Sequence, residues 1–166
     1  MKVLAIADTH VKTIAEIPLL DRAIRPHLKE VDLIIHAGDM LISEALEHLK
    51  SLKPTYAVAG NMDDPDLRWT LRQTVIVEFG RFKVGVAHGR GAPEGLERRV
   101  RQIFSKQEVD CIVFGHSHHP FVGMVEGVLM VNPGSLLDKR FAPKNTLAIL
   151  TANEKLDVEI FDVKVP

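Results

Sequence analysis

Residues 111–120 read Cys-Ile-Val-Phe-Gly-His-Ser-His-His-Pro, an apolar run that stops at a glycine and continues with imidazoles at alternate positions. Four consecutive apolar residues before a glycine are typical of a short strand that is buried on both faces. His116 and His118 then follow at the carboxyl end of this strand, and Pro120 closes the turn. The pattern predicts a strand that delivers two nitrogen ligands to one point.

The first half of the chain alternates short apolar runs with segments of helical periodicity. The expected buried strands are residues 3–7, 33–36 and 55–59. Between them, residues 20–31 carry apolar side chains on one helical face, with a kink expected at Pro26. Ser43 is expected to cap a second helix. This βαβαβ order favours parallel strands with helices on their faces.

The second half is richer in strands. The expected strands are residues 75–79, 83–87, 111–114, 121–124, 128–131, 147–150 and 158–161. A tight hairpin is expected at Gly80-Arg81, a helix that opens at Pro93, and a turn at residues 132–135, Asn-Pro-Gly-Ser. We therefore predict an α/β fold of two mixed β-sheets, packed as a sandwich and flanked by helices, in a single domain over residues 1–166.

Composition narrows the class of protein. Hydrophobic residues make up 46% and charged residues 26% of the chain, as in ordinary soluble domains. The formal net charge is -1, so nothing in the composition predicts a surface for nucleic acid or anionic membranes. The one cysteine, Cys111, excludes an intrachain disulfide. No apolar run approaches the about 18 residues of a membrane span, and we expect a cytoplasmic protein.

Metal-ligating side chains follow five of the expected strands. These strand ends are Asp8-Thr9-His10, Gly38-Asp39, Gly60-Asn61, His88 and His116-Ser117-His118. In α/β sheets the carboxyl ends of strands converge on a crevice, where ligands collect. Imidazole nitrogens with carboxylate or amide oxygens suit Mn²⁺, Fe²⁺, Zn²⁺, Co²⁺ or Ni²⁺. Seven ligands are too many for one such ion and suit two ions that share a carboxylate, an arrangement that serves phosphate chemistry.

The five blocks resemble, in order, the signature of the calcineurin-like metallophosphoesterases, and the resemblance spans nearly the whole chain. The short length, residues 132–135 and the Gly-Asn-Met-Asp sequence of residues 60–63 are similar to its small bacterial and archaeal phosphodiesterase branch. The resemblance implies a four-layer α/β/β/α fold and a binuclear site. It also implies hydrolysis of phosphodiesters by a hydroxide that bridges the ions. Mn²⁺ is the first expectation, with Ni²⁺, Zn²⁺, Fe²⁺ or Co²⁺ as alternatives.

The resemblance also implies a role for each residue. The first ion would be bound by Asp8, His10 and His118. The second would be bound by Asn61, His88 and His116, and Asp39 would bridge the two. The residues expected to serve catalysis are Asp39, Asn61 and Asp63. Asp63 would orient the site from behind the ligands, although Asp63 and Asp64 could instead form a simple turn before Pro65.

Two further residues bear on the site. In many members of the family a histidine follows the Gly-Asn pair and is taken as the general acid for the leaving group. Here that position is Met62, which can neither donate nor accept a proton. We therefore expect esters with good leaving groups, or protonation by metal-bound water or the substrate itself. His36, inside an expected strand, is interpreted as a satisfied histidine of the core or the crevice.

The small fold also resembles the phosphoesterase-like subunit of the retromer sorting coat, which is understood as a scaffold. A catalytically weak protein-binding scaffold is therefore the alternative function, although seven intact ligand positions favour an enzyme. Near-neutral charge argues against a long nucleic acid as substrate, while a dinucleotide remains compatible. We expect a small phosphodiester substrate, no membrane partner, and a homodimer or homotetramer.

Overall fold

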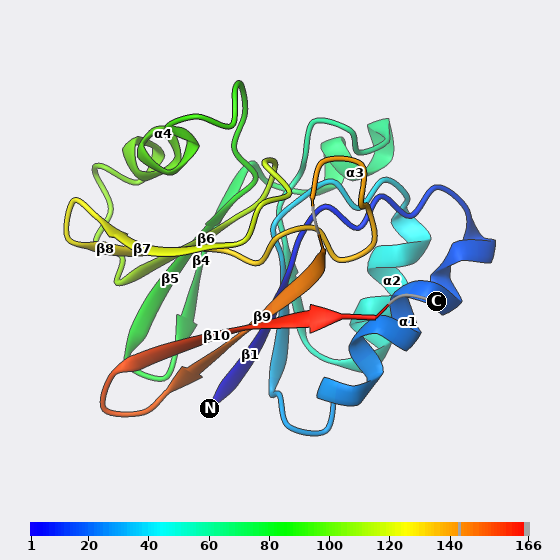
Figure 1. Cartoon of the computed structure of the whole chain (residues 1–166), viewed down its shortest axis with the longest axis horizontal. Helices are drawn as coiled ribbons and strands as arrows, with labels where there is room; N and C mark the ends of the chain where they lie inside the picture. The colour runs from blue at the N-terminus through cyan, green and yellow to red at the C-terminus, as the bar shows by residue number, and fades with distance from the viewer. Residues whose placement is uncertain (143, 165–166) are drawn as a thin grey trace.

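The computed structural model describes residues 1–142 and 144–164, and it places two five-stranded mixed sheets face to face between helices (Figure 1). In spatial order the first sheet consists of β10 (Leu156–Val163), β9 (Asn145–Ala152), β1 (Lys2–Ile6), β2 (Leu33–His36) and β3 (Thr55–Ala57). The second consists of β4 (Thr74–Phe79), β5 (Phe82–Ala87), β6 (Cys111–Phe114), β8 (Val128–Asn132) and β7 (Phe121–Val125). The predicted α/β class and the sandwich of two mixed sheets are confirmed.

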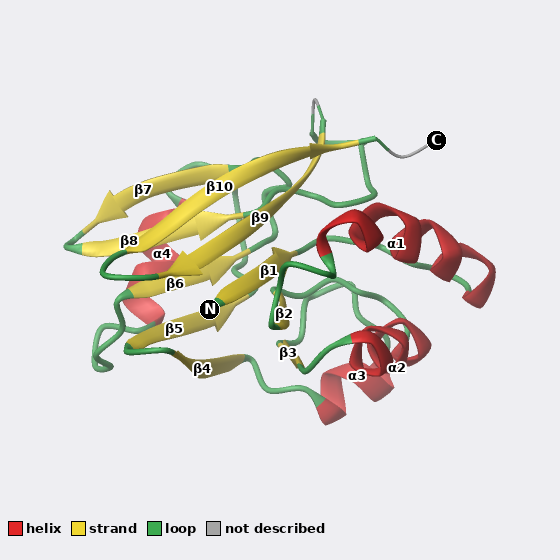
Figure 2. Ribbon diagram, turned by 90° about the horizontal axis from the view of Figure 1, so that it is seen from below, coloured by secondary structure: helices red, strands yellow, loops and turns green. Residues whose placement is uncertain are grey.

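Helices cover the outer face of each sheet. They are α1 (Ile17–Ile24), α2 (Ser43–Leu52), α3 (Pro65–Thr70) and α4 (Leu96–Ile103), with 3-10 turns at η1 (Ile14–Glu16) and η2 (Arg25–His27). Figure 2 shows α1 and α2 on the side of the first sheet and α4 on the side of the second. Among the described residues, no helix is both long and apolar enough to cross a membrane.

Alternation of side chains along the central strands builds the four layers. On β1, Leu4 and Ile6 pack into a cluster with residues of α1 and α2, whereas Val3 and Ala5 pack into the cluster between the sheets. On β6, Ile112 joins a third cluster with residues of α4. Because successive side chains of a strand point to opposite faces, fully apolar strands are needed to fill three layers of core.

Parallel pairing brings the predicted site residues to one edge of the sandwich. β1 pairs in parallel with β2, and β2 with β3, in the first sheet. β5 pairs in parallel with β6, and β6 with β8, in the second. The five strands that precede predicted ligands therefore run in parallel within each sheet, as a crevice at their carboxyl ends requires.

The helix predictions need four corrections. The helical face of residues 20–31 breaks at Ile24, because Pro26 lacks the N–H that would continue the helix, and a 3-10 turn follows. Ser43 does not cap α2: it is the first helical residue and Ile42 precedes it as the N-cap. Residues after Asp64 form α3, which was not predicted, with the Asp64 carboxylate accepting a hydrogen bond from the Leu67 N–H. The helix expected from Pro93 begins only at Leu96.

Candidate metal centre

Two buried groups of acidic and imidazole side chains meet between the carboxyl ends of β1, β2, β5 and β6. The first group contains Asp8, His10 and His118, and the second contains Asp8, Asp39 and His88. In each group one ligand atom per residue lies within 4.8 Å of the others. Five of the seven predicted ligands are thus brought together, and Asp8 belongs to both groups.

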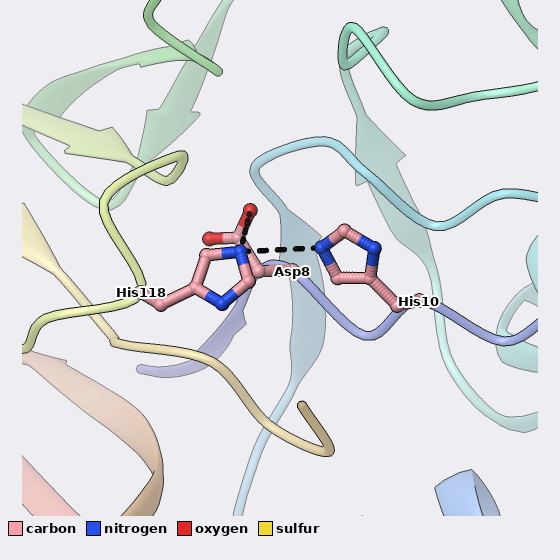
Figure 3. Close-up of side chains that lie close together, drawn as sticks. All are labelled: Asp8, His10 and His118. Atoms are coloured by element: carbon pink, nitrogen blue, oxygen red, sulfur yellow. Dashed lines mark hydrogen bonds and ion pairs between the residues drawn. The ribbon is translucent and has the colours of Figure 1, made fainter. Parts of the chain in front are cut away.

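The first group has the spacing of a cation site (Figure 3). The Nε2 atoms of His10 and His118 lie 3.2 Å apart, and His118 Nε2 lies 3.6 Å from Asp8 Oδ1. Two ligand atoms that are each about 2.1 Å from one ion would be roughly 3.0–3.4 Å apart at right or tetrahedral angles. Burial lowers the pKa of His118 to about 4 and also lowers the pKa of His10. Both imidazoles are therefore in the neutral form that binds metals.

The second group contains an imidazole nitrogen without a hydrogen-bond partner. His88 Nδ1 donates to the Ala37 carbonyl over 2.8 Å, which leaves Nε2 facing the carboxylates. This Nε2 lies 3.3 Å from Asp39 Oδ2 and 4.0 Å from Asp8 Oδ1, and it is buried without a hydrogen bond among the described residues. A buried imidazole nitrogen that faces two carboxylates is an arrangement that a bound cation completes.

The buried carboxylates of the metal-free site also favour the binding of a cation. Burial raises the pKa of Asp8 to about 7, even though the charge of His88 opposes the shift. Burial alone would lower the pKa of His88, but the Asp39 and Asp8 carboxylates outweigh it and raise that pKa to about 9. Without a metal, protons must neutralise this cluster. The residues present therefore fit divalent ions, which would replace those protons.

Backbone strain is concentrated at the same residues. Asp8, His10, Asp39, His116 and His118 all have positive φ, between 48° and 76°. Such conformations cost L-residues of order 1–3 kcal/mol each and persist where the surrounding structure enforces them. Five of the seven predicted ligands share this feature, so the fold holds their side chains at directions that ordinary strand or helix geometry does not give.

The loop after β3 is braced against the loop after β2 by Asp63. Its carboxylate accepts hydrogen bonds from the N–H groups of Leu41 (2.8 Å) and Gly60 (2.7 Å). A Cβ at Gly60 would clash with Asp39 Oδ1, so only glycine permits this approach. Asp63 is therefore a positioning residue, in keeping with the orienting role predicted for it. Asn61 follows directly and is exposed, and its role as a ligand stays a prediction.

His116 lies beside the two groups and belongs to neither. Its backbone N–H donates to Asp8 Oδ2 over 2.9 Å, and its ring is 5.2 Å from that of His88. Its Nε2 lies 2.9 Å from the Gly91 carbonyl and must donate to it, so Nδ1 keeps the lone pair. The structure thus shows His116 fixing Asp8 through its backbone, while its predicted role as a ligand stays untested.

Residues 132–138 contribute to the site in a way that the sequence did not predict. Asn132 Nδ2 donates to the Gly115 carbonyl and to Ser117 Oγ, each over 3.1 Å, and so holds the turn between His116 and His118. Ser135 Oγ donates to the Asp8 carbonyl over 2.7 Å. The Asn-Pro-Gly-Ser pattern indicated a turn, but nothing in it indicated that the turn braces Asp8, which lies 127 residues away in the sequence.

Asp138 and His36 complete the surroundings of the site. Asp138 Oδ2 lies 4.0 Å from His10 Nε2, and hydrogen bonds from Arg140 lower the pKa of Asp138 to about 2. No signal in the sequence pointed to Asp138. His36 is the satisfied buried histidine that was expected: Nδ1 accepts from the Gly38 N–H (3.2 Å), so Nε2 donates to Thr9 Oγ1 (3.0 Å).

Comparisons with known proteins bear on the family and the fold. Residues 1–155 match the model of the calcineurin-like phosphoesterase superfamily domain. A probable metallophosphoesterase of Methanothermobacter thermautotrophicus is 34% identical over 162 residues, which cover 97% of this chain and 92% of the relative. An archaeal phosphodiesterase of known structure has a TM-score of 0.78 at 23% identity, covering 99% of this chain and all of the other. Vps29 of Entamoeba histolytica, complexed with Zn²⁺, has a TM-score of 0.71 at 24% identity, covering 98% and 99%.

Proposed function

This chain belongs to the calcineurin-like phosphoesterase superfamily, and we propose that it hydrolyses phosphodiesters with two divalent ions held by the two buried groups. The observation that carries the proposal is the pair of Asp/His groups that share Asp8 at the carboxyl ends of strands from both sheets. Asp39 Oδ2 supports a bridging role, since it lies 3.3 Å from His88 Nε2 and 3.8 Å from His10 Nε2.

The residues of the chain divide the work between binding and orientation. Divalent ions bound by these residues would activate a water molecule for attack at neutral pH and would stabilise the charge that develops on the phosphoryl oxygens. Asp8 and Asp39 hold negative charge at the centre, and the neutral His10 and His118 complete the first group. Asp63, buried behind them, fixes the separation of the loops that carry Asp39 and Asn61.

The proposal is tested with bis(p-nitrophenyl) phosphate and p-nitrophenyl phosphate after chelation and reloading of the protein. We expect turnover of the diester with Mn²⁺, Ni²⁺, Zn²⁺, Co²⁺ or Fe²⁺, faster than turnover of the monoester, and none with EDTA. Mn²⁺ is proposed as the ion that supports the highest rate. Absence of turnover with every metal would contradict the enzyme proposal.

Met62 gives a second prediction about leaving groups. Met62 is 56% exposed beside the Asp39 loop, so an imidazole placed there has room to reach a bound substrate. We expect Met62→His to raise the rate for the poorest leaving groups by about tenfold or more, since general acids contribute about 10²–10⁴-fold. Rates across aryl methylphosphonates of graded phenol pKa measure this. Met62→Gln is the matched control, and an unchanged dependence on phenol pKa in Met62→His would refute the idea.

A binding scaffold is the second candidate function. Two observations favour it: methionine at the position of the general acid, and the fold likeness to Vps29 proteins. The metal groups are intact, which is why the enzyme is placed first. A cytoplasmic location, a small diester substrate rather than a long nucleic acid, and a homodimer or homotetramer complete the proposal.

A further inference from the structure

A hollow of about 300 Å³ opens beside the first metal group, between residues 9–19 and residues 137–140. We call it the arm pocket. His10 lines it and also belongs to the first metal group, so the hollow is continuous with the candidate reaction centre. Leu19 and Leu137 supply apolar wall, and Lys12 and Arg140 supply positive charge.

A phosphodiester needs such a space more than a monoester does. One substituent leaves during hydrolysis, and the other stays on the phosphate. A phosphoryl group held between the two Asp/His groups has His10 on one side, and the arm pocket lies next to His10. The retained substituent can therefore extend into the pocket without crossing the ligands of the ions.

The two cations of the pocket differ in how they are held. Lys12 is exposed and makes no ion pair among the described residues, while its backbone N–H donates to Glu16 Oε2 over 2.7 Å and fixes the loop. Arg140 Nε donates to both carboxylate oxygens of Asp138 at 2.9 Å. Its Nη1 makes no hydrogen bond in the described part of the chain. Lys12 thus carries the free charge, and Arg140 offers an oriented donor.

Both carboxylates of the pocket are already engaged. The charge of Asp138 is balanced by Arg140, and an oxygen of Glu16 accepts the Lys12 N–H. A phosphate group, which carries several acceptor oxygens in a tetrahedral array, can contact the Lys12 ammonium and the free edge of the Arg140 guanidinium together. The apolar walls formed by Leu19 and Leu137 suit the carbon skeleton between that phosphate and the reacting one.

We propose that the arm pocket selects phosphodiesters whose retained substituent carries a second phosphate, with Lys12 as the specificity-determining residue. The inference rests on the proposed function and names its substrate class. Hydrolysis of such a substrate adds a water oxygen to phosphorus and breaks the bond to the leaving oxygen. The retained substituent, which now carries two phosphate groups, is released as one product, and the leaving alcohol or phenol is released as the other.

Two substrates with the same leaving group test the selection. They are the p-nitrophenyl ester of thymidine 5′-phosphate and the same ester with a further 3′-phosphate. We expect the 3′-phosphate to raise kcat/KM by about tenfold, which corresponds to about 1.4 kcal/mol. Lys12→Met should lose this preference and Lys12→Arg should keep it. Lys106→Met, which removes an exposed charge in the turn after α4, should not change it.

A binding measurement on the metal-free protein provides a readout independent of turnover. Thymidine 3′,5′-bisphosphate should bind more tightly than thymidine 5′-phosphate by calorimetry, with a difference that shrinks at high salt and in Lys12→Met. If wild type hydrolyses both esters at equal kcat/KM, the inference is overturned and the phosphodiesterase proposal stands. If neither ester is hydrolysed with any metal, the proposed function fails, and equal binding of the two nucleotides then overturns the inference as well.

Discussion

Asp39→Asn should lower kcat/KM for bis(p-nitrophenyl) phosphate by about a thousandfold or more. Asp39 Oδ2 lies within 4 Å of His88 Nε2 and His10 Nε2, one residue of each predicted ion set. Removing its charge weakens the binding of both ions at once. A metal ion contributes several kcal/mol of transition-state stabilisation, and about 1.4 kcal/mol corresponds to a tenfold change in rate. The carbonyl of an asparagine can still accept the hydrogen bond that the Met62 N–H now donates over 2.7 Å. The variant should therefore fold.

The control for this variant is Asp162→Asn. Asp162 is an exposed residue of β10 that pairs with Lys144, and it should leave activity and metal content unchanged. Elemental analysis after reloading should find about one ion fewer per chain in Asp39→Asn than in wild type. Circular dichroism and thermal unfolding confirm that both variants are folded. Wild-type activity in a folded Asp39→Asn protein would remove Asp39 from the reaction.

The fold could be predicted from the sequence where burial is complete. The strands at residues 33–36 and 111–114 have the predicted bounds, because each apolar run lies wholly in the core and stops where backbone must turn toward the crevice. Helices were predicted less well, because their ends depend on single residues. Pro26 ended α1 rather than kinking it, and Asp64 with Pro65 began a helix where a turn was the alternative.

The candidate site was likewise predictable only in part. Asp8, His10, Asp39, His88 and His118 follow strands whose order fixes where they end, so the sequence predicted that they would meet. The braces of the site were not predictable. Asn132 and Ser135 act through hydrogen bonds to backbone groups 17 and 127 residues away, and no local spacing records such contacts. Asp138, too, comes close to His10 only because the fold brings distant parts of the chain together.

In the metal-free protein, the free energy of unfolding should fall as the pH rises from about 6.5 to about 9. The pKa of His88 is raised to about 9 in the folded chain, against 6.5 for an unperturbed histidine. Below pH 6.5 both the folded and the unfolded state hold the His88 proton, and the stabilisation of that charge by the Asp39 carboxylate is complete. Above pH 6.5 the unfolded chain loses the His88 proton before the folded chain does, so the free energy of unfolding declines by up to about 3 kcal/mol by pH 9. Urea unfolding in EDTA at several pH values measures this.

A bound ion should reverse the sign of this dependence. Metal must replace the proton on His88 Nε2, so binding strengthens as the pH approaches 9, and ligand binding adds to the stability of the folded state. Unfolding with excess Ni²⁺ should therefore show stability that rises over the interval where the EDTA-treated protein loses it. His88→Gln should abolish both trends, whereas His48→Gln, a matched change on α2, should preserve them. Stability in EDTA that is flat or rising from pH 6.5 to 9 would show that His88 is not held between charged carboxylates, and the case for a cation there would lose its electrostatic basis.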